Sequence, residues 1–224
     1  MEKEYTTVKV LKESPRGSVS LLRHNATGKR FIFRQYRGNG DVYRKLLPIS
    51  SPNLPEILEM AEADGQVAVL EEYIQGDSLS ALLAGALFTP AEVRRIGRQL
   101  SAALWTLHSF GAVHRDVKPE NVILREDRAI LIDFDASRLI KRGSDTDTMV
   151  LGTTGYAAPE QFGIAQTDQR ADIYAMGVLL NILLTGHHPS ETLAKGHLGR
   201  VIRKCTMMSP DNRYQSALAL MEAL

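Results

Sequence analysis

A stretch in the middle of the chain brings together side chains whose types and spacing could do chemistry. The run HRDVKPEN at residues 114–121 places Lys118 two residues after the carboxylate of Asp116, and the carboxamide of Asn121 three residues further on. A second carboxylate, Asp133, follows a predicted strand. Taken alone, Asp116 could be a loop carboxylate that caps a turn. The lysine and the carboxamide at these offsets favour a functional cluster instead, which the surrounding elements must hold in place.

The first part of the chain predicts an antiparallel sheet, because short apolar–polar alternations are separated by turn residues. The expected strands are residues 5–11, 18–24, 30–36, 57–61 and 66–73. A short helix at 41–47 is expected to end before Pro48. A hinge is expected near residues 73–77, where Gly76 interrupts the pattern.

After Gly76 the apolar period changes from two to 3.6, which predicts helices. They are expected at residues 79–83, 90–110, 172–184, 196–205 and 216–223, with two short strands at 122–124 and 130–132. The apolar stripe of the longest helix consists of Ala91, Val93, Ile96, Leu100, Ala103, Leu104 and Leu107. Residues 135–170 are expected to be irregular, and a loop of that length is usually functional. A sheet followed by helices predicts an α+β chain.

Composition narrows the class of protein. The chain carries 27 basic and 26 acidic side chains, which argues against a dedicated nucleic-acid-binding or membrane-surface protein. No apolar run approaches the roughly 18 residues of a membrane span, and no signal peptide is recognisable at the start. The single cysteine, Cys205, excludes an intramolecular disulfide and is typical of a reducing compartment. We therefore expect a soluble, cytoplasmic protein with no membrane segment and no nucleic-acid partner.

Five motifs in a fixed order give the chain a family resemblance. They are HRDVKPEN at 114–121, DFD at 133–135, GTTGYAAPEQF at 152–162, DIYAMG at 172–177 and DNR at 211–213. Together they resemble the protein kinases, and most closely the bacterial Ser/Thr kinases of eukaryotic type, over essentially the whole chain. The resemblance implies one bilobal kinase domain over residues 1–224. It would have a small five-stranded N-terminal lobe with one short helix (1–73), a hinge (74–77) and a larger, mainly helical lobe (78–224).

The resemblance implies a reaction, namely ATP- and Mg²⁺-dependent transfer of a phosphoryl group to Ser or Thr hydroxyls of a protein substrate. Such transfer depends on positioning and charge neutralisation more than on covalent chemistry. Asp116 is implied to orient the substrate hydroxyl and accept its proton, and Lys118 to steady the transferring phosphate. Asn121 and Asp133 are implied to hold Mg²⁺, since this hard cation prefers carboxylate and amide oxygens.

Other residues receive docking and scaffold roles from the same resemblance. The activation segment and its substrate-docking end would contain Thr148, Thr153, Tyr156 and Glu160. Thr153 would hydrogen-bond Asp116 and Lys118. The implied structural residues are His114, Arg115, Asp172 and Arg213, with Glu160 pairing with Arg213 and Asp172 holding the backbone of the catalytic loop.

The hydroxyl-rich stretch before the docking segment leaves two interpretations open. A phosphate on Ser144, Thr146 or Thr148 could pair with Arg115 and order the segment. Alternatively, the stretch is a solvated loop whose aspartates already supply the negative charge.

The nucleotide-binding residues implied by the resemblance are Gly17, Val19, Ile32, Arg34, Glu72, Ile74 and Ile123. This part departs from the family pattern. The turn at 12–19 keeps only its last glycine, and Pro15 removes an amide donor. Arg34 stands where the family has a lysine that holds the α- and β-phosphates, and the two side chains are not equivalent at a tight site.

Further departures surround that arginine. Ile32 replaces an alanine above the adenine, and Asp135 replaces the glycine after Asp133 and Phe134. Val42 stands where the helix should carry the glutamate that pairs with the strand cation, so an Arg34–Asp41 pair is a candidate substitute. Glu71 would border the back of the nucleotide pocket, unless it forms a salt bridge with an arginine.

Two functions follow as alternatives. An active Ser/Thr kinase is supported by the presence of Asp116, Lys118, Asn121 and Asp133. A pseudokinase, acting as a binding or switch module with weak or no ATP turnover, is supported by the departures in the N-terminal part. A small-molecule phosphotransferase is disfavoured, because the GTTGYAAPE segment suits a peptide substrate.

Overall fold

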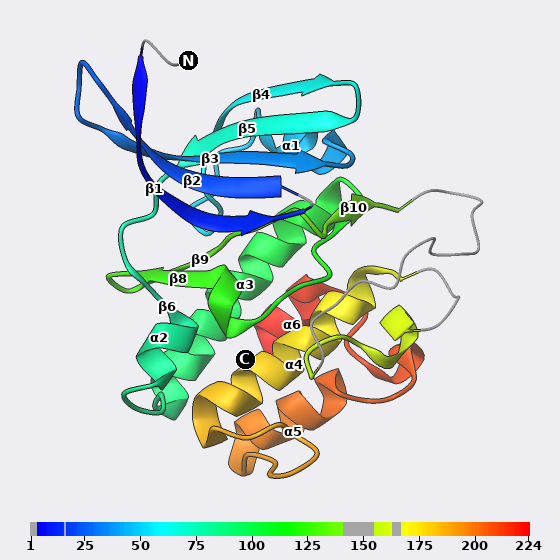
Figure 1. Ribbon diagram of the computed structural model, residues 1–224. Helices are drawn as coiled ribbons and strands as arrows, with labels where there is room; N and C mark the ends of the chain where they lie inside the picture. The colour runs from blue at the N-terminus through cyan, green and yellow to red at the C-terminus, as the bar shows by residue number, and fades with distance from the viewer. Residues whose placement is uncertain (1–3, 16, 141–154, 163–166) are drawn as a thin grey trace. The chain divides into compact units, whose positions relative to one another are not determined.

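The computed structural model describes residues 4–15, 17–140, 155–162 and 167–224. The chain divides into two compact units, Met1–Gln75 and Gly76–Leu224, whose elements are labelled in Figure 1. Each unit has its own sheet or sheets and its own buried residues. The units are described separately below.

The N-terminal unit contains a five-stranded antiparallel sheet and one short helix. Its strands are β1 (Tyr5–Ser14), β2 (Gly17–His24), β3 (Arg30–Arg37), β4 (Ile57–Ala63) and β5 (Gln66–Glu72), and its helix is α1 (Asp41–Leu46). The spatial order is β1-β2-β3-β5-β4, with antiparallel pairing throughout. The sheet and the short helix predicted from the sequence are confirmed.

The two faces of this sheet bury different side chains, because successive residues of a strand point to opposite faces. One face buries Leu22, Phe31 and Leu70, against which Tyr5, Phe33 and Leu58 pack. The other face carries Arg34 and Tyr36 of β3, both buried. Helix α1 packs on this second face, since the Tyr43 ring lies 6.1 Å from the ring of Tyr36.

The C-terminal unit is mainly helical and contains two small sheets. Its elements are β6 (Asp77–Ser78), α2 (Leu79–Leu83), α3 (Pro90–Ser109), β7 (Ala112–Val113), η1 (Pro119–Asn121), β8 (Val122–Arg125), β9 (Arg128–Leu131), β10 (Arg138–Leu139), η2 (Pro159–Phe162), α4 (Gln169–Thr185), α5 (Gly196–Cys205), η3 (Pro210–Asn212) and α6 (Ala217–Ala223). The strands form the sheets β6-β8-β9 and β10-β7.

Helix α3 is the central element of this unit. It begins with a capping box, in which the Thr89 hydroxyl accepts from the Glu92 N–H and the Glu92 carboxylate accepts from the Thr89 N–H. Pro90 occupies the first helical turn, where it removes no hydrogen bond. The predicted apolar stripe is buried, except for Ala91, which is exposed. The amphipathic pattern thus identified a core helix correctly.

The sequence missed the shortest elements. Strands β6, β7 and β10 have two residues each, too few for an alternating pattern to appear. The predicted irregular segment 135–170 contains β10 and η2, and α4 begins at Gln169 rather than 172. The α4 boundary is set by Asp168, whose carboxylate caps the helix by accepting from the Arg170 N–H.

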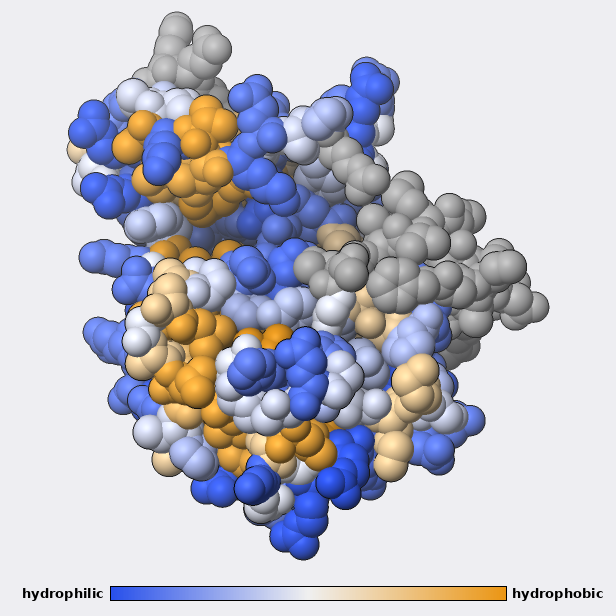
Figure 2. Space-filling view, turned by 60° about the horizontal axis from the view of Figure 1, so that its bottom comes forward, coloured by the Kyte–Doolittle hydropathy of each residue, from blue (hydrophilic) through white to orange (hydrophobic). Residues whose placement is uncertain are grey.

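On the face drawn in Figure 2, hydrophobic patches lie among hydrophilic residues. On β1, Val8, Val10 and Leu11 are each about half exposed, at 50%, 50% and 47%. Within the part of the chain that the structure describes, no helix has both the length and the apolar character needed to cross a membrane.

Candidate active site

The run 114–121 forms the loop that leads from β7 into η1, and its side chains converge on Asp116. The Lys118 Nζ lies 2.7 Å from the Asp116 Oδ2. The Asn121 Nδ2 donates to the same oxygen at 2.9 Å and to the Asp116 carbonyl at 2.8 Å. The Asp116 side chain is nevertheless 17% exposed. The Asp116 carboxylate is therefore both oriented by its neighbours and partly exposed.

A buried aspartate from α4 holds the start of this loop. Asp172 accepts hydrogen bonds from the backbone N–H of His114 at 2.9 Å and of Arg115 at 2.8 Å. His108 on α3 contacts the same carboxylate at 2.8 Å through Nε2. Burial acts to raise the pKa of Asp172, but the His108 hydrogen bond and the nearby charges outweigh it, so the pKa lies below its usual range.

This anchor stabilises an unusual backbone conformation. Arg115 has a φ of 71°, a region that side-chain-bearing residues rarely adopt. Such conformations persist where surrounding contacts over-determine them. Asp172 supplies such contacts, and Gln161 adds another by donating from Nε2 to the Arg115 carbonyl at 3.0 Å.

His114 supports the loop from inside the unit. It is fully buried, and burial lowers the pKa of its imidazole. The ring Nδ1 accepts from the Asp116 N–H at 3.3 Å, and Nε2 lies 3.3 Å from the Ile132 carbonyl. The ring also meets Phe134 edge-on at 5.5 Å. The buried ring therefore supports the Asp116 backbone from inside the unit.

A backbone hydrogen bond brings Asn121 close to Asp133. The Ile132 N–H, immediately before Asp133, donates to the Asn121 carbonyl at 2.9 Å. Because the Asn121 amide nitrogen donates to Asp116, its amide oxygen is the end of the side chain that can face a cation. One carboxamide and one carboxylate oxygen fit the donor preference of Mg²⁺. Asp133 has a φ of 70°, and its Oδ1 accepts a long hydrogen bond, 3.4 Å, from the Asp135 N–H.

No group of three or more His, Cys, Asp or Glu side chains suited to a metal occurs among the described residues. The Asn121–Asp133 pair is of a different type, because one of its donors is an amide.

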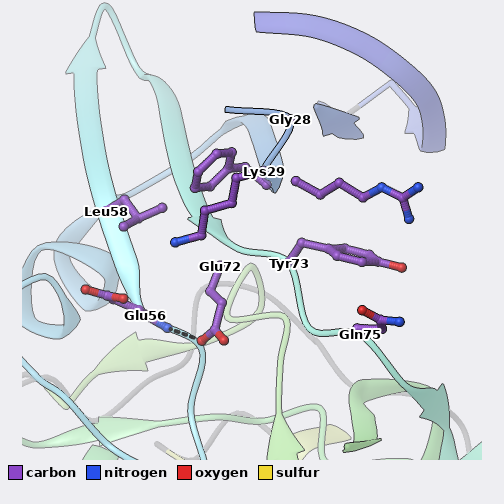
Figure 3. Close-up of a pocket in the computed structure, with 9 residues that line it drawn as sticks. Gly28, Lys29, Glu56, Leu58, Glu72, Tyr73 and Gln75 are labelled. Carbon is purple, nitrogen blue, oxygen red and sulfur yellow. Dashed lines mark hydrogen bonds between the residues drawn. The ribbon is translucent and has the colours of Figure 1, made fainter. Parts of the chain in front are cut away.

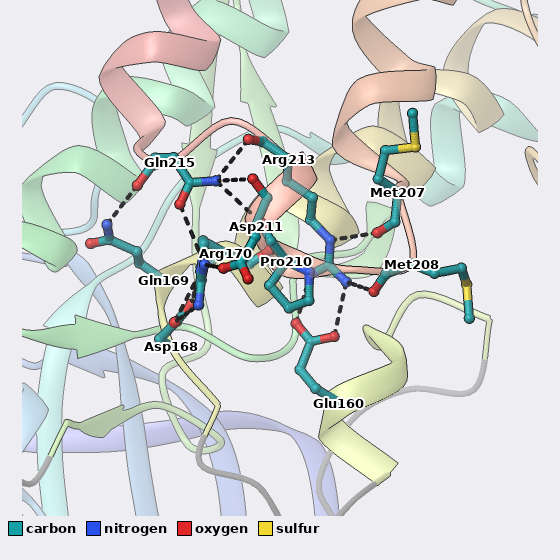
Figure 4. Close-up of polar contacts among 10 residues, drawn as sticks. All are labelled: Glu160, Asp168, Gln169, Arg170, Met207, Met208, Pro210, Asp211, Arg213 and Gln215. Atoms are coloured by element: carbon teal, nitrogen blue, oxygen red, sulfur yellow. Dashed lines mark hydrogen bonds and ion pairs between the residues drawn. The ribbon is translucent and has the colours of Figure 1, made fainter.

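A second polar network surrounds Glu160 and Arg213 (Figure 4). Arg213 is buried, and its guanidinium contacts both carboxylate oxygens of Glu160, at 2.6 and 2.9 Å. The same guanidinium donates to three main-chain carbonyls, those of Met207, Met208 and Arg170. Bidentate pairs of this kind fix geometry. They join η2 to the start of α4 and to the turn around η3.

Other residues of the activation segment are only partly described. Thr148 and Thr153 lie outside the described residues, as do Ser144 and Thr146. Tyr156 is half-buried, and burial, followed by the charge of Glu120, raises the pKa of its phenol to about 12. Tyr156 is therefore a neutral hydrogen-bonding group at physiological pH.

Two arginines belong to this part of the unit: Arg115 is in the loop itself, and Arg138 on β10 is paired with Val113 on β7, just before the loop. Burial lowers the pKa of Arg138 on β10, and the positive charge of Arg115 lowers it further. Burial also lowers the pKa of Arg115, against the opposing effect of Asp172.

Two supporting residues were missed in the sequence. His108 lies on the buried side of α3, and its signal was a polar residue directly after the apolar stripe. Gln161 is 2% exposed and joins the docking segment to the loop, yet a glutamine inside a recognised motif gave no separate signal.

In the N-terminal unit, Arg34 on β3 pairs with Glu71 on β5, Nε to Oε1, at 2.7 Å. The expected Arg34–Asp41 pair is wrong, because Asp41 instead contacts Arg44 of its own helix at 2.7 Å. The alternative role considered for Glu71, a salt bridge with an arginine, is the one the structure has. Asp41 pairs with Arg44 more readily than with Arg34, because residues three apart are neighbours on a helix.

The other residues assigned to the nucleotide lie on several elements. Val19 and Ile32 are half-buried on β2 and β3, Ile74 is buried, and Ile123 is half-buried on β8. Glu72 accepts from the Glu56 N–H at 3.3 Å. The Gly17 backbone is crowded, because a Cβ there would lie 2.1 Å from the Gln35 carbonyl. Packing against β3 is therefore sufficient to require a glycine at 17.

A hollow of about 530 Å³ opens in this unit, lined by Lys29, Phe31, Glu56, Leu58, Glu72 and Tyr73 among others (Figure 3). It lies on the opposite face of the sheet from Arg34, because Phe31 and Arg34 are three residues apart on one strand. The hollow is therefore not part of the phosphate grip expected around Arg34.

Comparison with known proteins agrees with this arrangement. Residues 17–222 match the family model described as protein kinase domain. The chain is 37% identical over 179 residues to the serine/threonine-protein kinase PknD of Mycobacterium tuberculosis, covering 75% of this chain and 27% of that protein. It is 32% identical over 195 residues to serine/threonine-protein kinase D of a Synechocystis species, covering 76% and 38%.

The chain thus spans about a quarter to two-fifths of the length of these curated relatives. A family model that covers nearly the whole chain, together with the geometry around Asp116, leads to one conclusion. The chain belongs to the protein kinase family, with serine/threonine-protein kinases among its relatives.

Proposed function

We propose that the chain transfers the terminal phosphoryl group of ATP, with Mg²⁺, to Ser or Thr hydroxyls of protein substrates. The observation that carries the proposal is the carboxylate of Asp116, oriented by Lys118 at 2.7 Å and by Asn121 at 2.9 Å. Asp116 would accept the proton of the attacking hydroxyl. The new bond joins the hydroxyl oxygen to phosphorus, and ADP leaves with the electrons of the broken P–O bond.

In this reaction Lys118 would interact with both Asp116 and the transferring phosphoryl group. Its ammonium lies against Asp116 and would move toward, or be shared with, the negative oxygens of the transferring phosphoryl group. Mg²⁺, held by Asn121 and Asp133, would neutralise charge on the phosphates. We assign the nucleotide contacts to Gly17, Val19, Ile32, Arg34, Glu72, Ile74 and Ile123. Tyr156 and Glu160, with Thr153, would form the substrate-docking end.

The alternative is a binding or switch module with weak or no ATP turnover. The crowded backbone at Gly17 favours it, because sheet packing then explains the one glycine that the turn retains. A single labelling experiment with ATP decides between the two functions.

The experiment incubates the purified protein with Mg²⁺ and γ-labelled ATP, alone and with a generic protein substrate, beside the variant Asp116→Asn. We expect label on Ser or Thr that disappears in the variant, together with a thermal upshift of the wild type by Mg·ATP. Omission of Mg²⁺ should also abolish labelling. Wild-type protein that neither labels nor shifts would refute the proposal, and so would labelling that survives in Asp116→Asn.

A further inference from the structure

The cation that replaces the family's strand lysine is held by a carboxylate from the neighbouring strand. Arg34 donates from Nε to the Glu71 Oε1 at 2.7 Å, and both residues are nearly inaccessible, with 4% and 2% exposure. The β3–β5 register places Ile32 opposite Glu71 and Arg34 opposite Val69. Arg34 and Glu71 are thus diagonal neighbours on one face of the sheet, within reach of long side chains.

Helix α1 packs on that same face but brings no carboxylate to the cation. Its buried side chains are Val42, Tyr43 and Leu46. Its acidic residue, Asp41, contacts Arg44, and Arg44 in turn contacts Glu62 on β4 at 2.6 Å. The charged groups of α1 therefore form their own partly exposed network, which fastens the helix to β4.

We propose that Glu71 is a positioning residue for Arg34, and that this pair within the sheet takes the place of the strand–helix ion pair of protein kinases. The placement of the phosphate-binding cation would then depend on β3 and β5 and not on α1. The proposal rests on the proposed function, in which Arg34 contacts the nucleotide phosphates.

The choice of arginine is consistent with this arrangement. An arginine has a donor at the base of its head group, Nε, in addition to two terminal amino groups, whereas a lysine has a single nitrogen. The bond to Glu71 uses Nε. A lysine at 34 would have to divide one ammonium between Glu71 and a phosphate, so arginine and Glu71 make one functional unit.

Burial makes the pair sensitive to the loss of either partner. Salt screens partners with this little exposure only weakly. Removal of the Glu71 charge takes away the carboxylate that holds Nε of the buried guanidinium, and the head group is expected to turn toward other acceptors. The direction of the Arg34 head group, rather than its charge, is what such a variant should change.

The test measures the Kd of Mg·ATP by titration calorimetry, and kcat and KM where turnover occurs, for the wild type and Glu71→Gln. We expect Glu71→Gln to weaken binding about tenfold or more while kcat changes by less than about threefold, as for a contact that binds ground state and transition state alike. The matched control is Glu62→Gln, which breaks the ion pair between α1 and β4. It should leave both constants within about twofold of wild type.

Arg34→Lys keeps the charge, and its own loss of binding can be measured even if Glu71→Gln does not fold. It should weaken Mg·ATP binding to a similar extent, and the double variant should be no weaker than Arg34→Lys alone, because the two residues act as one unit. Additive losses would indicate independent roles and overturn the proposal. Tighter binding by Arg34→Lys would also overturn it, and so would unchanged binding by Glu71→Gln or equal losses in Glu71→Gln and Glu62→Gln.

The two proposals fail in different ways. Wild-type protein that binds Mg·ATP without Asp116-dependent transfer would refute the proposed function, while the comparison of Kd values would still test the role of Glu71. Wild-type protein that does not bind Mg·ATP would refute both. Normal turnover with no effect of Glu71→Gln would refute only the role of Glu71.

Discussion

Replacement of Asp172 by asparagine should destabilise the C-terminal unit and disorganise the catalytic loop. The carboxylate is fully buried and accepts from three donors, two of them, His108 and the His114 N–H, at one oxygen and the Arg115 N–H at the other. An asparagine has one acceptor oxygen, so its NH₂ group must face at least one N–H.

The loss in the free energy of unfolding can be worked out from those contacts. The best orientation of asparagine loses one charge-assisted hydrogen bond, about 1.5–3 kcal/mol, and reduces the other two to neutral bonds, about 1 kcal/mol each. The total loss in the free energy of unfolding is about 3.5–5 kcal/mol. For a chain of this size, each kcal/mol corresponds to about 2–4 °C in Tm, so a decrease of roughly 7–20 °C is expected.

The assay is urea unfolding at pH 7, followed by circular dichroism and by the fluorescence of Trp105 on α3. The matched control is Asp127→Asn, because the Asp127 side chain is 85% exposed and its carboxylate pairs with Arg95 at the surface. Surface pairs contribute about 0–1 kcal/mol. A loss of less than about 1 kcal/mol in Asp172→Asn, or equal losses in the two variants, would refute the anchoring role.

Two further outcomes are expected. Glu160→Gln should lower the free energy of unfolding by about 3 kcal/mol in urea, because it leaves the Arg213 guanidinium buried without its counter-charge; a change below about 1 kcal/mol would contradict this. Burial lowers the pKa of His114, so the unfolded chain binds a proton below about pH 6.5 that the folded chain excludes. The Tm should therefore fall as the pH decreases from 7.5 to 5.5, and His114→Asn should make that decline shallower, whereas the exposed-site variant His197→Gln should not.

Long elements were predictable because each carries its own pattern. Helix α3 repeats its apolar stripe over five turns and begins with a proline and a capping box, so its type and start follow from local chemistry. The strand β10 has two residues and pairs with β7, about 25 positions earlier. Nothing within such a short segment distinguishes it from a loop, and only the pairing defines it as a strand.

Contacts in the candidate site are likewise of two kinds, those between residues close in sequence and those between residues far apart. Asp116, Lys118 and Asn121 lie within six residues, so their proximity follows from the chain itself. The contacts of Asp172 with the loop span 57 and 58 residues, and that of Glu160 with Arg213 spans 53. These pairs were expected only through the family resemblance, while His108 and Gln161, which support the same loop, were not expected at all.

The sequence by itself determined the α+β class, the order of the longer elements and the cluster around Asp116, because period, turn residues and short spacing are local properties. Only the tertiary structure decided the partner of Arg34. A shift of β5 by two residues against β3 would keep the same side chains on the same face and yet place a different residue beside Arg34. Arg34 and Glu71 are 37 residues apart in the sequence, and the register of β3 against β5 brings them into contact. The apolar patterns that predict helices and strands do not encode that register.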